Sequence, residues 1–480
     1  MEKENVSQPG KKTKLTAYVL VAAAIAAIGG ILFGFDTGVI SGAILFIVKQ
    51  WNLTHKQAEL ATSSVLIGAV LGALAGGVLG DRLGRRLSII YATVLFLAGT
   101  LIVSIADGMT SFLIGRVLIG AAIGVASFMV PLYISELAPA QIRGSMVSLN
   151  QFAVTVGILV SYGVNYYYAS TENWRAMFAV GAVPGLILLF GMVALPDSPR
   201  WLFSVGLREA AEKVLRKIRG TPQVTEELAE IDEAIRSESG GKVSDLLSPP
   251  VRLALIIGVG LAILQQVTGV NTVIYYAPAI FKGAGLQSDT AAIAATSGIG
   301  VVNVVFTGVS LWLIDRVGRR PLLLWSVAGM TVALMVLGLG FALRGDEAEA
   351  GGGGGLGLIT AVSLMVYIAF FAIGLGPIFW LLIAEIYPLK LRAPGMSVAT
   401  VANWGANFLV AYTFLTLAGL LGKAGIFWFY GLMGVITWLF VDRLVPETKG
   451  KTLEEIEEYF ISRAGPPRKG REQRELRRAS

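Results

Sequence analysis

The sequence predicts an all-α membrane protein in which twelve transmembrane helices form two pseudo-symmetric six-helix bundles, joined by a cytoplasmic helical linker. Three observations predict this fold: the composition, a series of long apolar runs, and an internal repeat. Of the 480 residues, 55% are hydrophobic and only 15% are charged, and the mean hydropathy is +0.69. Since about 25% of the residues of an ordinary soluble domain are charged, this composition excludes a pair of soluble domains.

The apolar runs predict where the chain crosses the bilayer, at about 20 residues per crossing. The predicted spans are centred near residues 32, 70, 97, 122, 157 and 185 in the first half, and near 266, 301, 332, 371, 405 and 434 in the second. The first run is much longer than the core of a signal peptide, so we interpret it as the first spanning helix.

The placement of charge predicts the orientation. Most of the 39 lysines and arginines fall in the tails and the even-numbered loops, and the positive-inside rule therefore places both termini in the cytoplasm. Because the charges flank apolar runs, the net charge of +7 is explained by topology, and we expect no nucleic-acid partner. The expected organisation is a cytoplasmic tail at 1–15, a first bundle at 16–199, a linker at 200–250, a second bundle at 251–446 and a cytoplasmic tail at 447–480.

The linker carries two charged, amphipathic segments, REAAEKVLRKIRG and TEELAEIDEAIRSE. Their pattern is typical of surface helices with i,i+4 charge pairs. Two interpretations remain open, an inner latch or brace and a solvated linker.

Three motifs recur about 240 residues apart. DRLGRR at 81–86 returns as DRVGRR at 315–320, and PDSPR at 196–200 is matched by PETKG at 446–450. An acid and a base seven residues apart follow the fourth span and again the tenth. A repeat of this length indicates two six-helix bundles with a cleft between them, the parallel repeat of a transporter. All copies lie on the predicted inner side and mix acids with bases, so we expect a charged inner gate made by Arg82, Glu136, Arg143, Arg316, Glu385 and Arg392.

Two charged residues lie well inside the predicted spans, Asp36 in the first and Arg116 in the fourth. Each costs about 2.5 to 3.5 kcal/mol at the centre of a spanning helix, so the pair needs a reason. Arg116 is expected near the outer end of its span, where it can meet Asp36. A structural ion pair is one interpretation. The favoured one is a proton-coupling site, because protonation neutralises Asp36 and frees Arg116.

A polar cluster, QQVTGVNTVIYY at 265–276, interrupts the seventh apolar run. Because unpaired polar groups are costly in hydrocarbon, these residues should face a protein-lined cavity. Amides supply both donors and acceptors, and aromatic rings cover the apolar face of a sugar. The cluster therefore predicts a cavity for a neutral polyol.

Several other functions are excluded or disfavoured. The chain has no cysteine, which excludes disulfides and thiolate metal sites, and its one histidine, His55, has no predicted metal-binding partners. We expect no metal and no cofactor. Without a G-x-x-x-x-G-K-[ST] phosphate loop or a catalytic constellation, we expect a secondary active transporter and no enzyme or ATP-driven pump.

Over roughly residues 16–460, the chain resembles the sugar porters of the major facilitator superfamily. The resemblance is carried by the motifs GGILFGFDTGVISGA, DRLGRR, GRVLIGAAIGVAS followed by PLYISELAPAQIRG, PDSPRWL, QQVTGVNTVIYYAP, DRVGRRPL, GPIFWLLIAEIYP and VPETKG. It implies that the residues contacting the sugar are Gln151, Gln265, Gln266, Asn271, Asn303, Trp380 and Asn403, with Trp404 and Phe33 lining the pocket. It also implies that Tyr275 and Tyr276 close the outer side. Independently of the family, the glycines and proline of GLGPIFW predict a local break in the tenth span.

The resemblance also bears on coupling and substrate. The aspartate at position 36 resembles that of the proton-coupled members, whereas mammalian facilitative glucose carriers have asparagine there. Ile158 and Asn403 resemble the glucose carriers, whereas the bacterial xylose symporter has glutamine at both positions; Ala372 stands where the mammalian carriers have glutamate. We expect a proton-coupled hexose symporter, glucose first, that works as a monomer in a bacterial plasma membrane. The alternatives are a proton-independent facilitative carrier, a pentose or myo-inositol symporter, and a non-transporting sugar sensor.

Overall fold

The computed structural model describes residues 16–139, 142–238, 243–344, 354–451 and 453–463. Within these ranges the chain forms helices, turns and bends, and no β-strand is present. The predicted tail at 1–15 and the last part of the C-terminal tail, 464–480, lie outside the described residues. The predicted all-α fold is confirmed.

The first half begins with five long helices and a sixth crossing that is interrupted once. Its helices are α1 (Ala17–Trp51), α2 (His55–Leu83), α3 (Arg85–Ser104), α4 (Met109–Leu137), α5 (Arg143–Ala169), α6 (Trp174–Ala179) and α7 (Ala182–Ala194). The linker that follows contains α8 (Pro199–Ser204), α9 (Arg208–Arg219), α10 (Thr225–Glu238) and the 3-10 turn η2 (Val243–Leu247).

The second half has two crossings that are each broken into two helices. Its elements are α11 (Pro249–Val267), α12 (Val270–Gly283), α13 (Asp289–Val317), α14 (Arg319–Arg344), α15 (Gly354–Ile373), α16 (Leu375–Glu385), the 3-10 turn η4 (Leu389–Leu391), α17 (Arg392–Leu444) and α18 (Leu453–Arg463).

Helix α17 accounts for two of the predicted spans. It runs for 53 residues, and Gly422, at φ 74° and ψ 167°, leaves helical geometry inside it. Among the described residues, 11 helical segments are long and apolar enough to cross a membrane. Because α17 is divided at Gly422, these segments supply the twelve predicted crossings.

Close helix pairs build the first bundle, since small residues let spanning helices approach each other. Helix α1 packs along α5, and α2 packs along α4. At Gly34 on α1, an added Cβ would lie 1.9 Å from the carbonyl oxygen of Val154 on α5. Only glycine therefore fits at this crossing, which fixes where α1 presents its polar residues.

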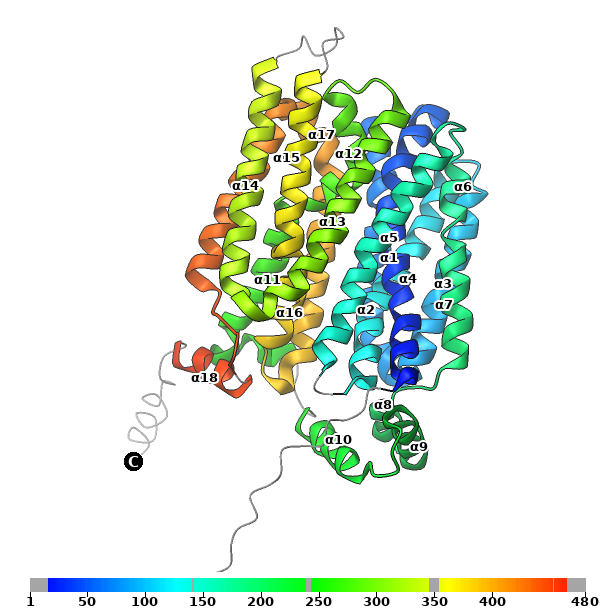
Figure 1. The fold of residues 1–480 in the computed structure, drawn as a ribbon, viewed down its shortest axis with the longest axis vertical. Helices are drawn as coiled ribbons and strands as arrows, with labels where there is room; N and C mark the ends of the chain where they lie inside the picture. The colour runs from blue at the N-terminus through cyan, green and yellow to red at the C-terminus, as the bar shows by residue number, and fades with distance from the viewer. Residues whose placement is uncertain (1–15, 140–141, 239–242, 345–353, 452, 464–480) are drawn as a thin grey trace, which may run out of the picture.

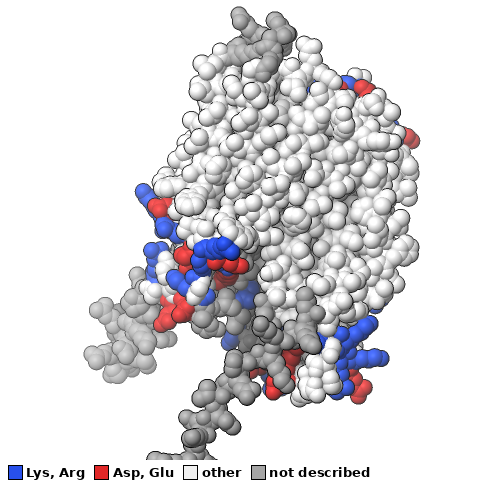
Figure 2. All heavy atoms as spheres, viewed as in Figure 1, with Lys and Arg blue, Asp and Glu red and all other residues white. Residues whose placement is uncertain are grey.

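The two ends of the molecule differ. Helices α8, α9, α10 and α18 gather at one end, at the bottom of Figure 1, which we call the linker side; the opposite end is the far side. Figure 2 shows charged side chains at the ends and a broad uncharged band between them. This distribution is typical of a protein surrounded by lipid.

Candidate functional site

A cavity of about 90 Å³ lies between helices of the two halves. It is bordered by α1 and α5 of the first half and by α11, α12, α13, α15, α16 and α17 of the second. The structure brings all nine predicted sugar-contacting and pocket-lining residues to its wall: Phe33, Gln151, Gln265, Gln266, Asn271, Asn303, Trp380, Asn403 and Trp404. Residues from spans far apart in the sequence therefore meet in one place.

The first broken crossing places the polar cluster at this cavity. Helix α11 ends at Val267 and α12 begins at Val270, with Gly269 between them at φ 87°. The carbonyl oxygen of Thr268, freed by the break, accepts a hydrogen bond of 2.9 Å from the hydroxyl of Tyr367. Irregular backbone at membrane depth is tolerated where it lines a cavity and its polar groups are paired, as they are here.

The second broken crossing lies at Gly374, inside the GLGPIFW segment where a break is predicted. The hydroxyl of Ser326 accepts from the N–H of Leu375 at 3.0 Å, and the hydroxyl of Ser310 donates to the carbonyl of Ile373 at 2.6 Å. The side-chain amide of Gln265 donates to the carbonyl of Leu375 at 2.8 Å. Gln265 therefore links the two breaks, so the position of Trp380 on α16 depends on the polar cluster.

Four amide side chains form a closed hydrogen-bond network at the cavity wall. Nε2 of Gln266 donates to Oδ1 of Asn403 at 3.1 Å and to Oε1 of Gln265 at 3.2 Å. Nδ2 of Asn271 donates to Oε1 of Gln266 at 2.7 Å, and Nδ2 of Asn403 donates to Oε1 of Gln265 at 2.8 Å. Such networks hold each amide in one orientation, so the wall presents a fixed pattern of polar atoms.

Other polar atoms at the wall have no protein partner in the described part of the chain. No hydrogen bond joins the amides of Gln151 or Asn303 to another described residue, and Nε1 of Trp404 is buried without a partner. Asn407, which is not among the residues predicted from the sequence, donates to the hydroxyl of Tyr275 at 3.3 Å and keeps an unpaired, buried Oδ1. A ligand with several hydroxyls would satisfy these groups.

Aromatic rings cover the cavity from two directions. Phe33 and Trp404, from opposite bundles, are in contact with ring centroids 5.4 Å apart. Tyr275 lines the cavity, whereas Tyr276 lies behind it, where its hydroxyl donates to the carbonyl of Ala411 at 3.1 Å. Both tyrosines are buried, and their role in closing the outer side remains a prediction.

Asp36 and Arg116 meet beside the cavity, as the sequence predicts. Nη1 of Arg116 donates to Oδ1 of Asp36 at 2.5 Å, and the two side chains are 0% and 3% exposed for Arg116 and Asp36 respectively. Arg116 also donates to the carbonyl of Thr62 at 3.4 Å, and its guanidinium lies 5.6 Å from the ring of Phe178. Thr37, the neighbour of Asp36, lines the cavity. The ion pair and the amide-lined cavity are therefore adjacent.

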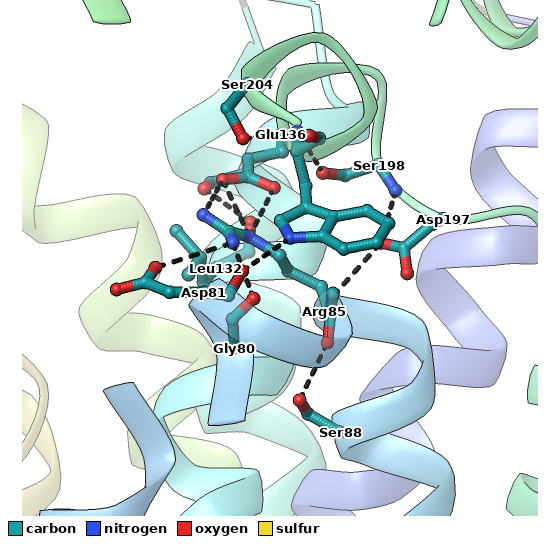
Figure 3. Close-up of polar contacts among 12 residues, drawn as sticks. Gly80, Asp81, Arg85, Ser88, Leu132, Glu136, Asp197, Ser198 and Ser204 are labelled. Atoms are coloured by element: carbon teal, nitrogen blue, oxygen red, sulfur yellow. Dashed lines mark hydrogen bonds and ion pairs between the residues drawn. The ribbon is translucent and has the colours of Figure 1, made fainter. Parts of the chain in front are cut away.

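On the linker side, the repeated motifs of the first half form one cluster (Figure 3). Nε of Arg85 donates to Oε2 of Glu136 at 3.0 Å, and its Nη2 donates to Oε1 at 3.0 Å. Asp197 accepts from the backbone N–H groups of Arg85 and Arg86 at 3.0 and 3.3 Å, which caps the start of α3. Burial raises the pKa of the Asp197 carboxyl, and the N–H groups it accepts from oppose that rise.

The second half repeats this arrangement. Arg319 donates to Oε1 of Glu385 at 3.1 Å, and Glu447 accepts from the backbone N–H groups of Arg319 and Arg320 at 3.0 and 3.1 Å. Thr448 also donates to Oε2 of Glu385, at 2.6 Å. Glu447, the acid of PETKG, therefore caps the start of α14 just as Asp197, the acid of PDSPR, caps the start of α3.

The four arginines expected in the inner gate lie outside these hydrogen bonds. Arg82 and Arg143 are exposed, and Arg316 is exposed with its guanidinium 3.9 Å from the ring of Trp312. Arg392 is half-buried. In this conformation each gate glutamate binds the arginine that directly follows the motif's glycine, within its own bundle. Pairing across the bundles remains a prediction.

The glycines of the two motifs give a matched pair of stability predictions. Gly84 and Gly318 have φ values of 86° and 109°, and a Cβ there would lie 2.2 Å from Oδ2 of Asp197 and 2.7 Å from Oε2 of Glu447. We expect Gly84→Ala and Gly318→Ala each to lower the melting temperature of the detergent-solubilised protein, with strain of about 1–3 kcal/mol. Gly77→Ala, where a Cβ meets nothing within 4 Å, is the control. Equal melting temperatures for all three variants would contradict this account of the motif.

Comparison with known proteins adds the family. Residues 22–460 match the family model described as "Sugar (and other) transporter". The chain belongs to this family. The transporter is 40% identical to the D-xylose transporter of Levilactobacillus brevis, over 92% of its own length and 95% of that protein. It is 37% identical to the major myo-inositol transporter IolT of Bacillus subtilis (strain 168), over 91% and 93% of the two chains.

The transporter also resembles a solved structure closely. The proton:xylose symporter XylE bound to 6-bromo-6-deoxy-D-glucose matches with a TM-score of 0.78 and 35% identity, covering 93% of this chain and 100% of that one. XylE comes from E. coli and is a member of the major facilitator superfamily. The predicted major facilitator fold and the assignment as a sugar transporter that is no enzyme are confirmed.

Proposed function

We propose that the protein is a proton-coupled symporter that imports a monosaccharide, most favourably a hexose such as glucose, by alternating access. The observation that carries this proposal is the buried ion pair between Asp36 and Arg116, located next to a cavity lined by amides and aromatic rings. A sugar carrier without coupling needs the cavity alone. Burying a charge pair within the membrane carries a desolvation cost, and proton coupling gives a reason for the pair to be kept there.

The sugar would bind to groups that differ in their present partners. Gln151, Asn303 and the indole N–H of Trp404 offer free hydrogen-bonding capacity. Gln265, Gln266, Asn271 and Asn403 would offer their remaining lone pairs and protons in the fixed directions set by their network. Phe33 and Trp380 would pack on the apolar faces of the sugar ring.

Coupling follows from what protonation changes at Asp36. When a proton from outside binds to the carboxyl of Asp36, the carboxyl loses its charge and its ion pair with Arg116 is weakened. Sugar then binds and the two bundles rock. The sugar and the proton are released inside. One proton crossing 100 mV contributes about 2.3 kcal/mol. At about 1.4 kcal/mol per tenfold change, the membrane potential alone supports roughly fiftyfold accumulation.

The choice of hexose rests on two cavity residues. Ile158 and Asn403 resemble the glucose carriers, and the xylose symporter of bacteria has glutamine at both positions. Asparagine is shorter than glutamine by one methylene, which leaves more room at the wall. XylE binds a glucose derivative in its solved structure, which supports the proposal that a cavity of this family accepts a six-carbon sugar. The D-xylose and myo-inositol relatives support a pentose or a cyclitol as the alternative.

The orientation and gates complete the proposal. The linker side would face the cytoplasm with both termini, in the plasma membrane of a bacterium, and the monomer would be the working unit. Tyr275 and Tyr276 would close the cavity on the outer side. The inner gate would include Arg85 and Arg319 besides the six residues expected from the sequence, because these arginines hold Glu136 and Glu385.

Uptake into proteoliposomes tests the proposal. We expect labelled glucose to accumulate above equilibrium when an inward proton gradient is imposed, and to equilibrate without accumulation when it is absent. Unlabelled xylose, arabinose and myo-inositol, added as competitors, rank the substrates. Equilibration that ignores the gradient would identify a facilitative carrier, and sugar binding without uptake would identify a sensor.

A further inference from the structure

A buried carboxylate lies where the two bundles meet on the far side. Glu59, in the second turn of α2, is 0% exposed. Its Oε1 accepts from the backbone N–H of Thr416 on α17 at 2.7 Å, and its Oε2 accepts from the hydroxyl of the same residue at 2.8 Å. Both carboxylate oxygens of Glu59, in the first bundle, therefore accept hydrogen bonds from one residue of the second bundle.

The same two helices make a second contact one turn earlier on each of them. Lys56 forms an ion pair of 3.0 Å with Glu59, and its ammonium lies 4.7 Å from the ring centroid of Tyr412 on α17. The spacing is three residues on α2 and four on α17, so one face of each helix is involved. Lys56 and Glu59 thus contact Tyr412 and Thr416 as a unit, which we call the α2–α17 latch.

The burial of Glu59 depends on the contact between α2 and α17 on the far side. A carboxylate withdrawn from water is stable only when it is paired and hydrogen-bonded, and Glu59 obtains its hydrogen bonds from the opposite bundle. Rocking the bundles apart on this side would break both bonds to Thr416 at once, and water would replace them. Bonds to a charged group are stronger than neutral ones, so the latch favours the closed arrangement.

The α2 segment that carries Glu59 also touches the ion pair. Arg116 donates to the carbonyl of Thr62, one turn further along α2, and the hydroxyl of Ser63 donates to the carbonyl of Glu59 at 2.7 Å. The ion pair and the latch therefore contact neighbouring turns of the same helix. Neither Glu59 nor Thr416 lines the cavity.

We propose that Glu59 is a positioning residue of the transport cycle, whose bonds to Thr416 hold the far side closed and so set the ratio of far-side-closed to far-side-open protein. This inference rests on the proposed alternating access between two arrangements of the bundles. It does not depend on which sugar is carried or on whether a proton is coupled.

Distance measurement between two spin labels tests the latch. The chain has no cysteine, so Thr171→Cys and Gln287→Cys, both exposed at the far side and on opposite bundles, give a single labelled pair. Pulsed dipolar spectroscopy on the sugar-free protein in lipid nanodiscs then reports the fractions of short and long far-side distances.

We expect Glu59→Gln to shift the ratio toward the long distance by about tenfold, which corresponds to about 1.4 kcal/mol. Thr416→Val keeps the backbone N–H and removes only the hydroxyl bond, so it should shift the ratio in the same direction but less. The two changes should be non-additive in a double-mutant cycle, because they remove parts of one interaction. Thr413→Val, whose hydroxyl donates to Leu409 inside its own helix, is the matched control and should leave the ratio unchanged.

Transport supplies a second readout that a merely structural role would not move. With the latch weakened, the apparent affinity for sugar offered from the far side should rise and that from the linker side should fall, each by the measured shift in population. Unchanged distance distributions in both Glu59→Gln and Thr416→Val, with proteins that remain folded, would overturn the proposal. If Glu59→Gln fails to fold, Thr416→Val decides alone. If no sugar is transported but the distances shift, the proposed function fails and the latch stands.

Discussion

Asp36→Asn is expected to abolish accumulation of sugar driven by a proton gradient while sugar exchange across the membrane continues. Asparagine resembles the protonated carboxyl in size and charge, and its Oδ1 can still accept from Nη1 of Arg116. The variant should therefore fold and bind sugar, but it has no proton to release. Accumulation in proteoliposomes should fall from many-fold to the equilibrium level, while counterflow of labelled sugar against preloaded unlabelled sugar persists.

Thr37→Val is the control for this result. Thr37 is the next residue, lines the same cavity, and donates from its hydroxyl to the carbonyl of Phe33 at 2.8 Å. We expect this variant to bind sugar less tightly and to remain coupled. Accumulation that survives in Asp36→Asn would show that the proton site lies elsewhere and would leave the pair with Arg116 as a packing element.

The second large effect, a loss of sugar affinity, is expected when amides at the cavity wall are replaced. It distinguishes amides that are free to bind sugar from amides that also hold the hydrogen-bond network together. Gln151→Leu should weaken sugar binding by about 10- to 100-fold with little change in melting temperature, because no described residue hydrogen-bonds its amide. A bond lost to a polar ligand, with the ligand's group left unpaired, costs about 1–3 kcal/mol. Gln265→Leu should lose comparable affinity and also lower the melting temperature, since its amide holds Leu375, Gln266 and Asn403.

Intrinsic fluorescence measures this binding, because Trp380 and Trp404 line the cavity. A titration with sugar in detergent gives the dissociation constant, and thermal unfolding of the same samples gives the melting temperature. Asn303→Leu should behave like Gln151→Leu. If Gln151→Leu destabilises the protein as much as Gln265→Leu does, the distinction between free and networked amides is wrong.

The spans were predictable because hydrophobicity over about 20 residues is a local property of the sequence. The break in the tenth span was predictable as well, since glycine and proline weaken a helix wherever they occur. The break at Gly269 was not predicted. A single glycine beside threonine is common in intact spans, and this one breaks the helix where Tyr367 of another span is positioned to bind the freed carbonyl.

The site residues divide in the same way. The amides at the cavity wall could be found because their sequence motifs resemble those of a family. Asn407 has no such signal. The bonds from Arg85 to Glu136 depend on the turn at Gly84, where φ is 86°, and no local pattern distinguishes Arg85 from the other arginines of its motif. Glu59 reads locally as an acid near a helix start. Its burial depends on which face of α2 meets α17, and that is decided by the arrangement of bundles rather than by nearby residues.

The acids that cap the start of α3 and of α14 bear on how the protein folds during its synthesis. Asp197 lies 112 residues after Arg85, and Glu447 lies 128 residues after Arg319, so each half is fastened by a residue that follows its own last crossing. In the first half, Asp197, Arg85 and Glu136 are all residues of that half, so these bonds can form before the second half is present. We expect the first bundle to finish folding in the bilayer while the ribosome is still translating the second, since domains made first generally fold first. The helices of the second bundle would then pack against a first bundle that is already folded.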